Sequence, residues 1–114
     1  ARCFALGQAL GDAVREWPED IRVAFVASGG LSHFTVDPDL DRTVMDAFLA
    51  CDGNVLGNIP RVRLNSGNSE IRNWIAVAGA CSGLAPEWHD YIPCYRTPAG
   101  TGCGMGFAIL GKRP

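Results

Sequence analysis

The chain of 114 residues carries little charge of either sign and lacks a long apolar run. Ten Lys and Arg residues against twelve Asp and Glu residues give a formal net charge of -2, and no basic cluster occurs. Nucleic acids and anionic membranes are therefore poor candidate partners. No apolar segment approaches the roughly 20 residues that span a bilayer, and no charged segment followed by an apolar one marks a secretory signal. We therefore expect a cytoplasmic protein.

The cysteines show neither of the patterns that build a small structural scaffold. Their number, five, is odd, and no C-x-x-C spacing occurs. These absences argue against a disulfide framework and against a structural zinc site. The simplest prediction is a set of buried free thiols, as is usual in a reducing cytoplasm, at Cys3, Cys51, Cys81, Cys94 and Cys103.

The length and the start of the chain bear on its organisation. A chain of 114 residues with 47% hydrophobic and 19% charged residues has room for one globular domain and no second core. It begins at Ala1, without a methionine, and enters a helical pattern almost at once. This suggests a segment of a longer protein, although proteolysis or removal of a tag would also explain the missing methionine.

Apolar periodicity predicts alternating helices and strands. Apolar residues between Phe4 and Trp17 recur at helical spacing, Pro18 ends that helix, and a strand follows over Ile21–Ala27. Helix followed by strand is half of an alternating unit and indicates an α/β layered domain. Further along, the pattern predicts helices over 40–51 and 70–80 and strands over 90–95 and 106–110.

The apolar run Val23–Ala27 ends at Gly29-Gly30, and His33 follows immediately. In open α/β sheets, ligands bind outside the carboxyl ends of the strands, and glycines let the backbone turn sharply or approach a ligand closely. His33 is therefore the first catalytic candidate. The alternative is a turn at the end of a strand, whose histidine only forms hydrogen bonds with nearby backbone.

Glu70 lies in the first turn of the most apolar predicted helix, at the edge of its buried face. One interpretation is a carboxylate that stabilises the helix N-terminus, which contributes about 0.3 to 1 kcal/mol. The other is a carboxylate at the rim of a pocket. With His33 and His89 it would complete the two-histidine, one-carboxylate set of non-haem Fe(II) oxygenases. The polar segment 87–90, however, favours a surface position for His89.

The glycine-rich segment 96–105 lies between the last two predicted strands. It contains no G-x-G-x-x-G register, and the residues that follow are too few for the helix that a dinucleotide site requires. Two interpretations remain open: a loop whose backbone amides line a site, or a tight hairpin.

Several separated motifs occur in a familiar order. Arg2–Gly7, Pro18–Asp20 and Gly29–His33 are followed by Glu70 with Trp74, and then by Tyr95 with Pro98-Ala99. This series resembles the class III extradiol ring-cleavage dioxygenases, in particular the catalytic subunits that cleave protocatechuate at the 4,5 bond and their gallate-cleaving relatives. The resemblance implies a three-layer α/β/α-type domain with a mixed sheet, of which residues 1–114 form the C-terminal part.

The resemblance also implies roles for individual residues. His33 matches the acid/base histidine that handles the substrate hydroxyl proton, and Glu70 matches the single carboxylate ligand of the ferrous ion. Gly100 and Thr101 fall where the family holds the carboxylate or equivalent substituent of the substrate, and Ser32 is placed among the substrate-binding residues. Because protocatechuate enzymes have Ser-Asn in place of Gly100-Thr101, the identity of the aromatic substrate stays open.

The two histidine ligands of the family lie in its N-terminal half and have no counterpart here. The leading hypothesis is therefore that a full-length protein performs Fe(II)-dependent extradiol cleavage of a catechol-type substrate with O2, and that this chain alone is inactive. The alternative is a non-catalytic remnant or accessory domain without the metal site. A small partner subunit or a homodimer is compatible with either. If the N-terminal half of the domain is absent, the surface against which it would pack should be an exposed apolar sheet face or edge.

Overall fold

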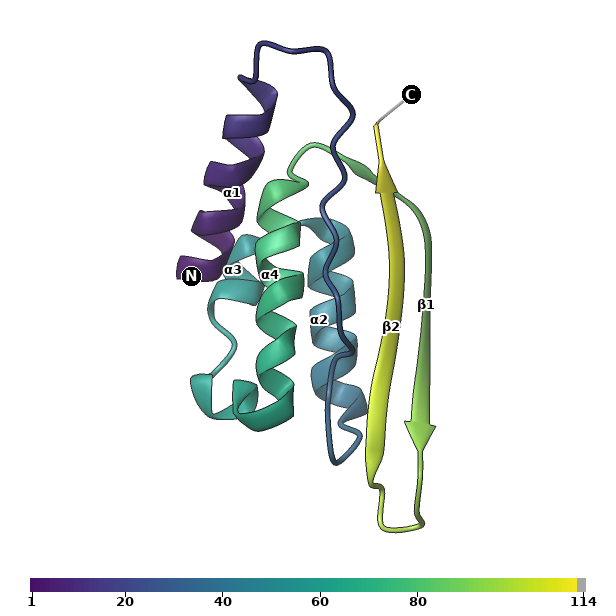
Figure 1. Cartoon of the computed structure of the whole chain (residues 1–114). Helices are drawn as coiled ribbons and strands as arrows, with labels where there is room; N and C mark the ends of the chain where they lie inside the picture. Colours follow the sequence, from purple (N-terminus) through teal and green to yellow (C-terminus); the bar gives the residue numbers. More distant parts are fainter. Residues whose placement is uncertain (113–114) are drawn as a thin grey trace.

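The computed structural model describes residues 1–112. Its helices lie on one side of a long β-hairpin, and an extended segment runs between α4 and β2 in the view of Figure 1. With η marking a 3-10 helix, the elements follow in the order α1 (Arg2–Arg15), α2 (Pro38–Ala50), α3 (Gly53–Gly57), η1 (Arg61–Leu64), η2 (Ser66–Glu70), α4 (Ile71–Ala80), β1 (Ala85–Tyr95) and β2 (Gly102–Gly111). Helices packed with a sheet confirm the predicted α/β class. No helix among these residues is long and apolar enough to cross a membrane.

The helices begin and end close to where local sequence signals place them. The Asp37 side chain caps α2 by accepting the N–H of Leu40, and Pro38 occupies the first turn. The residues just before α4 form the 3-10 helix η2. Between α1 and α4 the contact is made by small residues, because a Cβ on Gly7 would lie 2.7 Å from the carbonyl carbon of Ala76. Helices α1 and α4 therefore pack with their backbones unusually close.

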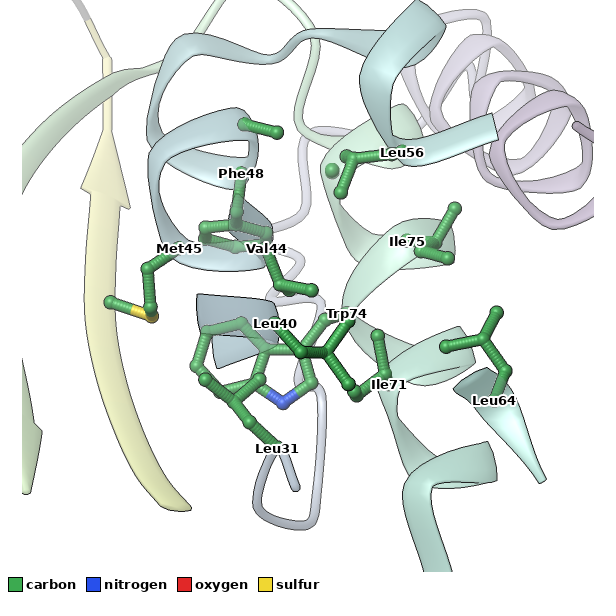
Figure 2. Close-up of a cluster of buried hydrophobic side chains, with 12 residues drawn as sticks. Leu31, Leu40, Val44, Met45, Phe48, Leu56, Leu64, Ile71, Trp74 and Ile75 are labelled. Atoms are coloured by element: carbon green, nitrogen blue, oxygen red, sulfur yellow. The ribbon is translucent and has the colours of Figure 1, made fainter. Parts of the chain in front are cut away.

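The hydrophobic core lies between α2 and α4 and is closed by the segment that follows Gly30. Trp74 is at its centre, with Leu31 and Leu40 beside its indole (Figure 2). The ring of Phe48 meets Trp74 edge-on, with centroids 5.1 Å apart. The buried cluster comprises Leu31, Leu40, Val44, Met45, Ala47, Phe48, Leu56, Leu64, Ile71, Trp74, Ile75 and Ala78.

The sheet of the described residues has two antiparallel strands, β1 and β2, with Cys94 opposite Cys103. The strands predicted over 90–95 and 106–110 are confirmed, and each is longer than expected. Residues 102–105, expected in the glycine-rich loop, belong to β2, so the segment is the turn of a hairpin. The mixed sheet implied for the whole domain needs parallel strands, and residues 1–112 contain none.

The prediction of a strand over Ile21–Ala27 is wrong for residues 1–112. The segment is extended but has no ladder partner, and Val26 is 79% exposed. A strand exists only with a neighbour that takes its backbone hydrogen bonds. Here an open groove of about 610 Å³, lined by residues 23–27 and 106–110, separates the segment from β2.

The outer face of the hairpin confirms the expectation of an exposed apolar surface. Trp88 contacts Phe107 across the strands at 6.4 Å between ring centroids, and both side chains remain exposed. Ile92 and Ile109 extend the same apolar surface. The five cysteines are free thiols as predicted, but the prediction of burial holds only for Cys81, whose pKa is raised by that burial.

Candidate active site

The turn that carries His33 is fastened to the beginning of β2. The Leu31 N–H donates to the carbonyl of Gly104 at 2.8 Å, and the Gly104 N–H donates back to Ser32 at 2.9 Å. Further along, Gly102 donates to the carbonyl of Phe34 at 2.8 Å. These bonds make residues 31–36 an irregular neighbour of β2, on the edge opposite β1. His33 is thereby held beside the hairpin turn.

His33 and Glu70, widely separated in the sequence, meet in the structure. The imidazole Nε2 lies 3.2 Å from Oε2 of Glu70, and the two side chains are 19% and 46% exposed. On the other side of the ring, Nδ1 donates to the carbonyl of Leu31 at 2.8 Å. A neutral ring with this Nδ1–H tautomer directs the lone pair of Nε2 towards the carboxylate. A cation between the two groups, whether a proton or a metal ion, relieves that repulsion.

Glycines form the surfaces on which this pair rests. A Cβ on Gly67 would lie 2.8 Å from Cγ of His33, and a Cβ on Gly29 would lie 2.9 Å from Cδ of Glu70. Gly29 also has φ of +121°, a conformation that side chains disfavour. Any larger residue at position 29 or 67 would displace one member of the pair.

Side chains from η2 and α4 hold the turn in place. The indole N–H of Trp74 donates to the carbonyl of Gly29 at 3.1 Å, and the amide of Asn73 donates to Ser28 at 3.2 Å. The backbone N–H of His33 donates to Oδ1 of Asn68 at 2.6 Å. Sequence reasoning missed Asn68 and Asn73. The cluster of Asn and Ser before α4 was a signal for Asn68, because such side chains bind backbone groups, whereas Asn73 lies within α4.

Gly100 and Thr101 lie at the turn of the hairpin. The carbonyl of Gly100 accepts the N–H of Val36 at 2.9 Å, and its own N–H donates to Thr97 at 3.1 Å. Thr101 pairs with Thr35, two residues after His33. The structure therefore brings both residues to the same end of the molecule as His33.

Ser32 does not have the exposure that a substrate contact requires. The residue is fully buried, and its hydroxyl donates to Oδ2 of Asp41 at 2.6 Å while accepting the N–H of Asp37 at 3.0 Å. The expected role in substrate binding is thus corrected for the side chain of Ser32, which points into the protein.

Asp41 is a buried carboxylate that sequence reasoning missed. It accepts hydrogen bonds from the backbone N–H and hydroxyl of Ser32 and from the hydroxyl of Tyr91. Burial and the hydrogen bond to Asp41 raise the pKa of Tyr91 well above its ordinary value. A signal was present, since Asp41 shares the apolar stripe of α2 with Val44 and Phe48.

Within residues 1–112, no three His, Cys, Asp or Glu side chains come close enough to hold a metal ion together. His89 is exposed on β1, as predicted, opposite Ala108. The hypothetical set of His33, His89 and Glu70 is therefore not assembled. Glu70 offers an accessible carboxylate, a group that can serve as one ligand of a metal ion.

Comparison with known proteins gives two similarities. Residues 1–106 match the family model described as the catalytic LigB subunit of aromatic ring-opening dioxygenase. Over 32 residues the chain is 59% identical to gallate dioxygenase of Pseudomonas putida, a stretch that covers 28% of this chain and 9% of that enzyme. The aligned stretch is thus a small part of the length of this curated relative. No solved structure matches the chain.

Proposed function

This chain belongs to the family of catalytic LigB subunits of aromatic ring-opening dioxygenases, and we propose that it is the C-terminal part of an enzyme that cleaves a catechol-type ring with O2 at an Fe(II) site. The observation that carries the proposal is the contact between His33 and Glu70. It joins a proton-transfer group and an accessible carboxylate at 3.2 Å. The 59% identity to a stretch of gallate dioxygenase is in keeping with an aromatic substrate.

In this proposal, His33 is the acid/base residue. The hydrogen bond from Nδ1 to Leu31 fixes the ring and leaves Nε2 as the atom that exchanges a proton. The ring is partly exposed, so a substrate hydroxyl can approach it. His33 would take the proton of that hydroxyl and return it later in ring cleavage.

Glu70 would be the single carboxylate ligand of the iron, whose chemistry when bound is the activation of O2 and of the catechol oxygens. The side chain stands at the junction of η2 and α4, and α4 is packed into the core, so the carboxylate is held at the start of a rigid helix. One carboxylate does not hold Fe(II) tightly. We therefore expect the isolated chain to be inactive and the two histidine ligands to come from residues outside it.

Gly100 and Thr101 would receive the ring substituent of the substrate. Their position at the hairpin turn, paired with the segment that carries His33, supports this role. The apolar outer face of the hairpin would be covered by the rest of the enzyme, by a small partner subunit or by a second copy. The cytoplasmic location stays a prediction from composition.

A non-catalytic remnant is the second candidate, favoured by the lack of a complete ligand set within residues 1–112. Anaerobic Fe(II) binding separates the two candidates. The longer protein should bind about one Fe(II), lose it with Glu70→Ala, keep it with the control His89→Ala, and open catechol rings. A longer protein that binds no iron would support the remnant. Tight, Glu70-dependent Fe(II) binding by the 114-residue chain alone would refute the expectation that the two histidine ligands lie outside this chain.

A further inference from the structure

We infer that Asp41 is a positioning residue that orients the His33 imidazole and selects its tautomer through the peptide group between Leu31 and Ser32. The inference rests on the proposed acid/base role of His33, and it gives a function to a buried carboxylate that the proposed reaction does not otherwise use.

The geometry is a relay through one planar unit. The N–H of Ser32 donates to Oδ1 of Asp41 at 2.8 Å. The carbonyl of Leu31 belongs to the same peptide group and accepts Nδ1–H of His33 at 2.8 Å. Because a peptide group is rigid and planar, fixing its N–H also fixes the direction of its C=O. Asp41 thus orients the acceptor to which the imidazole is bound.

The charge of Asp41 acts along the same path. A carboxylate that accepts an amide N–H polarises the peptide, and its carbonyl oxygen then becomes a stronger acceptor. A stronger acceptor at Nδ1 favours the tautomer that keeps its proton there. The lone pair of Nε2, the atom facing Glu70, is then available for proton transfer.

Burying the Asp41 carboxylate costs folding free energy, and its hydrogen bonds offset that cost only in part. Within residues 1–112 no Lys, Arg or His forms an ion pair with it, so its charge is met by hydrogen-bond donors alone. The carboxylate also lies against the backbone of β2, where a Cβ on Gly104 would be 2.7 Å from its Cγ. Buried charges without a counter-ion are expensive, and a neutral side chain would fill this space more cheaply.

If Asp41 had only a structural role, its substitution would lower stability without changing the His33 tautomer. Ser32→Ala and Tyr91→Phe each remove one hydroxyl donor but leave the bond between the Ser32 N–H and the Asp41 carboxylate. Asp41→Asn removes the charge behind the peptide. All three variants should lose stability, because each disturbs a buried hydrogen bond. Only Asp41→Asn should change the His33 tautomer.

The test is nitrogen NMR of ring-labelled histidine in the 114-residue chain, with wild type and variants compared at one fixed alkaline pH. The chain contains two histidines, and exposed His89 serves as the internal reference. Wild type should show His33 with the proton on Nδ1. Asp41→Asn should shift its tautomer ratio towards Nε2–H by about two- to tenfold, because loss of the charge weakens the neighbouring bond between Nδ1–H and the Leu31 carbonyl by about 10 to 30%.

Asp39→Asn is the matched control, since it removes an exposed carboxylate from the same helix, and it should leave the ring signals of His33 unchanged. Where Asp41→Asn fails to fold, Asp41→Ser removes the same charge with a smaller side chain. An Nε2–H tautomer in wild type, or a folded neutral variant at Asp41 with wild-type His33 signals, would overturn the inference. The NMR signals of His33 can be measured without catalysis. An inactive enzyme would therefore refute the proposed function but would not affect the test of Asp41.

Discussion

Gly67→Ala should disturb the proposed active site more than it disturbs the fold. The added Cβ would lie 2.8 Å from Cγ of His33, whereas carbon atoms in contact are about 3.5 to 4.0 Å apart. The ring or the backbone of η2 must therefore move by roughly 1 Å. Gly67 itself has no positive φ, so the substitution introduces a clash and no backbone strain.

The His33 ring is not free to make that movement. Its backbone N–H is bound to Asn68 at 2.6 Å and its Nδ1 to Leu31 at 2.8 Å. Overpacking of a fixed site costs about 1 to 3 kcal/mol of unfolding free energy, and Gly67 is half-buried, which favours the lower end. A shift of about 1 Å in a catalytic group, by contrast, lowers turnover by up to about 100-fold.

Two measurements check this prediction. Urea unfolding of the 114-residue chain gives the stability, and ring cleavage by the longer protein gives the turnover. Gly83→Ala is the matched control: Gly83 has φ of +90° with nothing within 4 Å of an added Cβ, so alanine there costs about 1 to 2 kcal/mol in strain alone. The control should keep its turnover. Gly67→Ala with wild-type stability and turnover would refute the packing of His33 on Gly67.

Three further substitutions test the contacts around the site. Trp74→Phe removes the hydrogen bond to Gly29 and should cost about 1 to 2 kcal/mol of unfolding free energy in urea; unchanged stability would contradict the bond. Asp37→Ala removes the cap of α2 and should cost about 0.5 to 2 kcal/mol in the same assay. The raised pKa of Tyr91 predicts stability that is full below about pH 10 and falls above it by up to about 1.4 kcal/mol per pH unit, since only the unfolded chain releases the proton there. Tyr91→Phe should flatten this alkaline loss, and an unchanged slope would contradict the role of Tyr91.

The helices could be predicted from the sequence because their causes are local. In α2, the cap at Asp37 and the stripe that includes Leu40 and Val44 are both within a few turns of each other. The strand over 21–27 could not be settled in this way. Its apolar run fits a strand, but strand formation depends on a partner strand that local sequence does not identify, and residues 1–112 do not provide one.

Only part of the site could be predicted, because its residues come together through contacts between segments that are distant in sequence. His33 and Glu70 stood out singly, one after a glycine pair and one at a helix edge, but their contact at 3.2 Å is a property of the tertiary structure. Ser32 was placed among the substrate-binding residues. Its side chain is instead buried, and its hydroxyl donates to Asp41. Local sequence does not reveal that burial.

The position of the site depends on one helix that is itself positioned by packing far from His33. Trp74 and Asn73 of α4 hold the glycine turn through backbone carbonyls, and Glu70 immediately precedes the same helix. At its other end, α4 is seated against α1, where Gly79 would bring a Cβ within 2.9 Å of the Gln8 amide nitrogen. Helix α4 is rigid over this length, so a change in the α1 contact alters where the turn is held. The distance between His33 and Glu70 is therefore set by helix packing as well as by the residues that touch the pair.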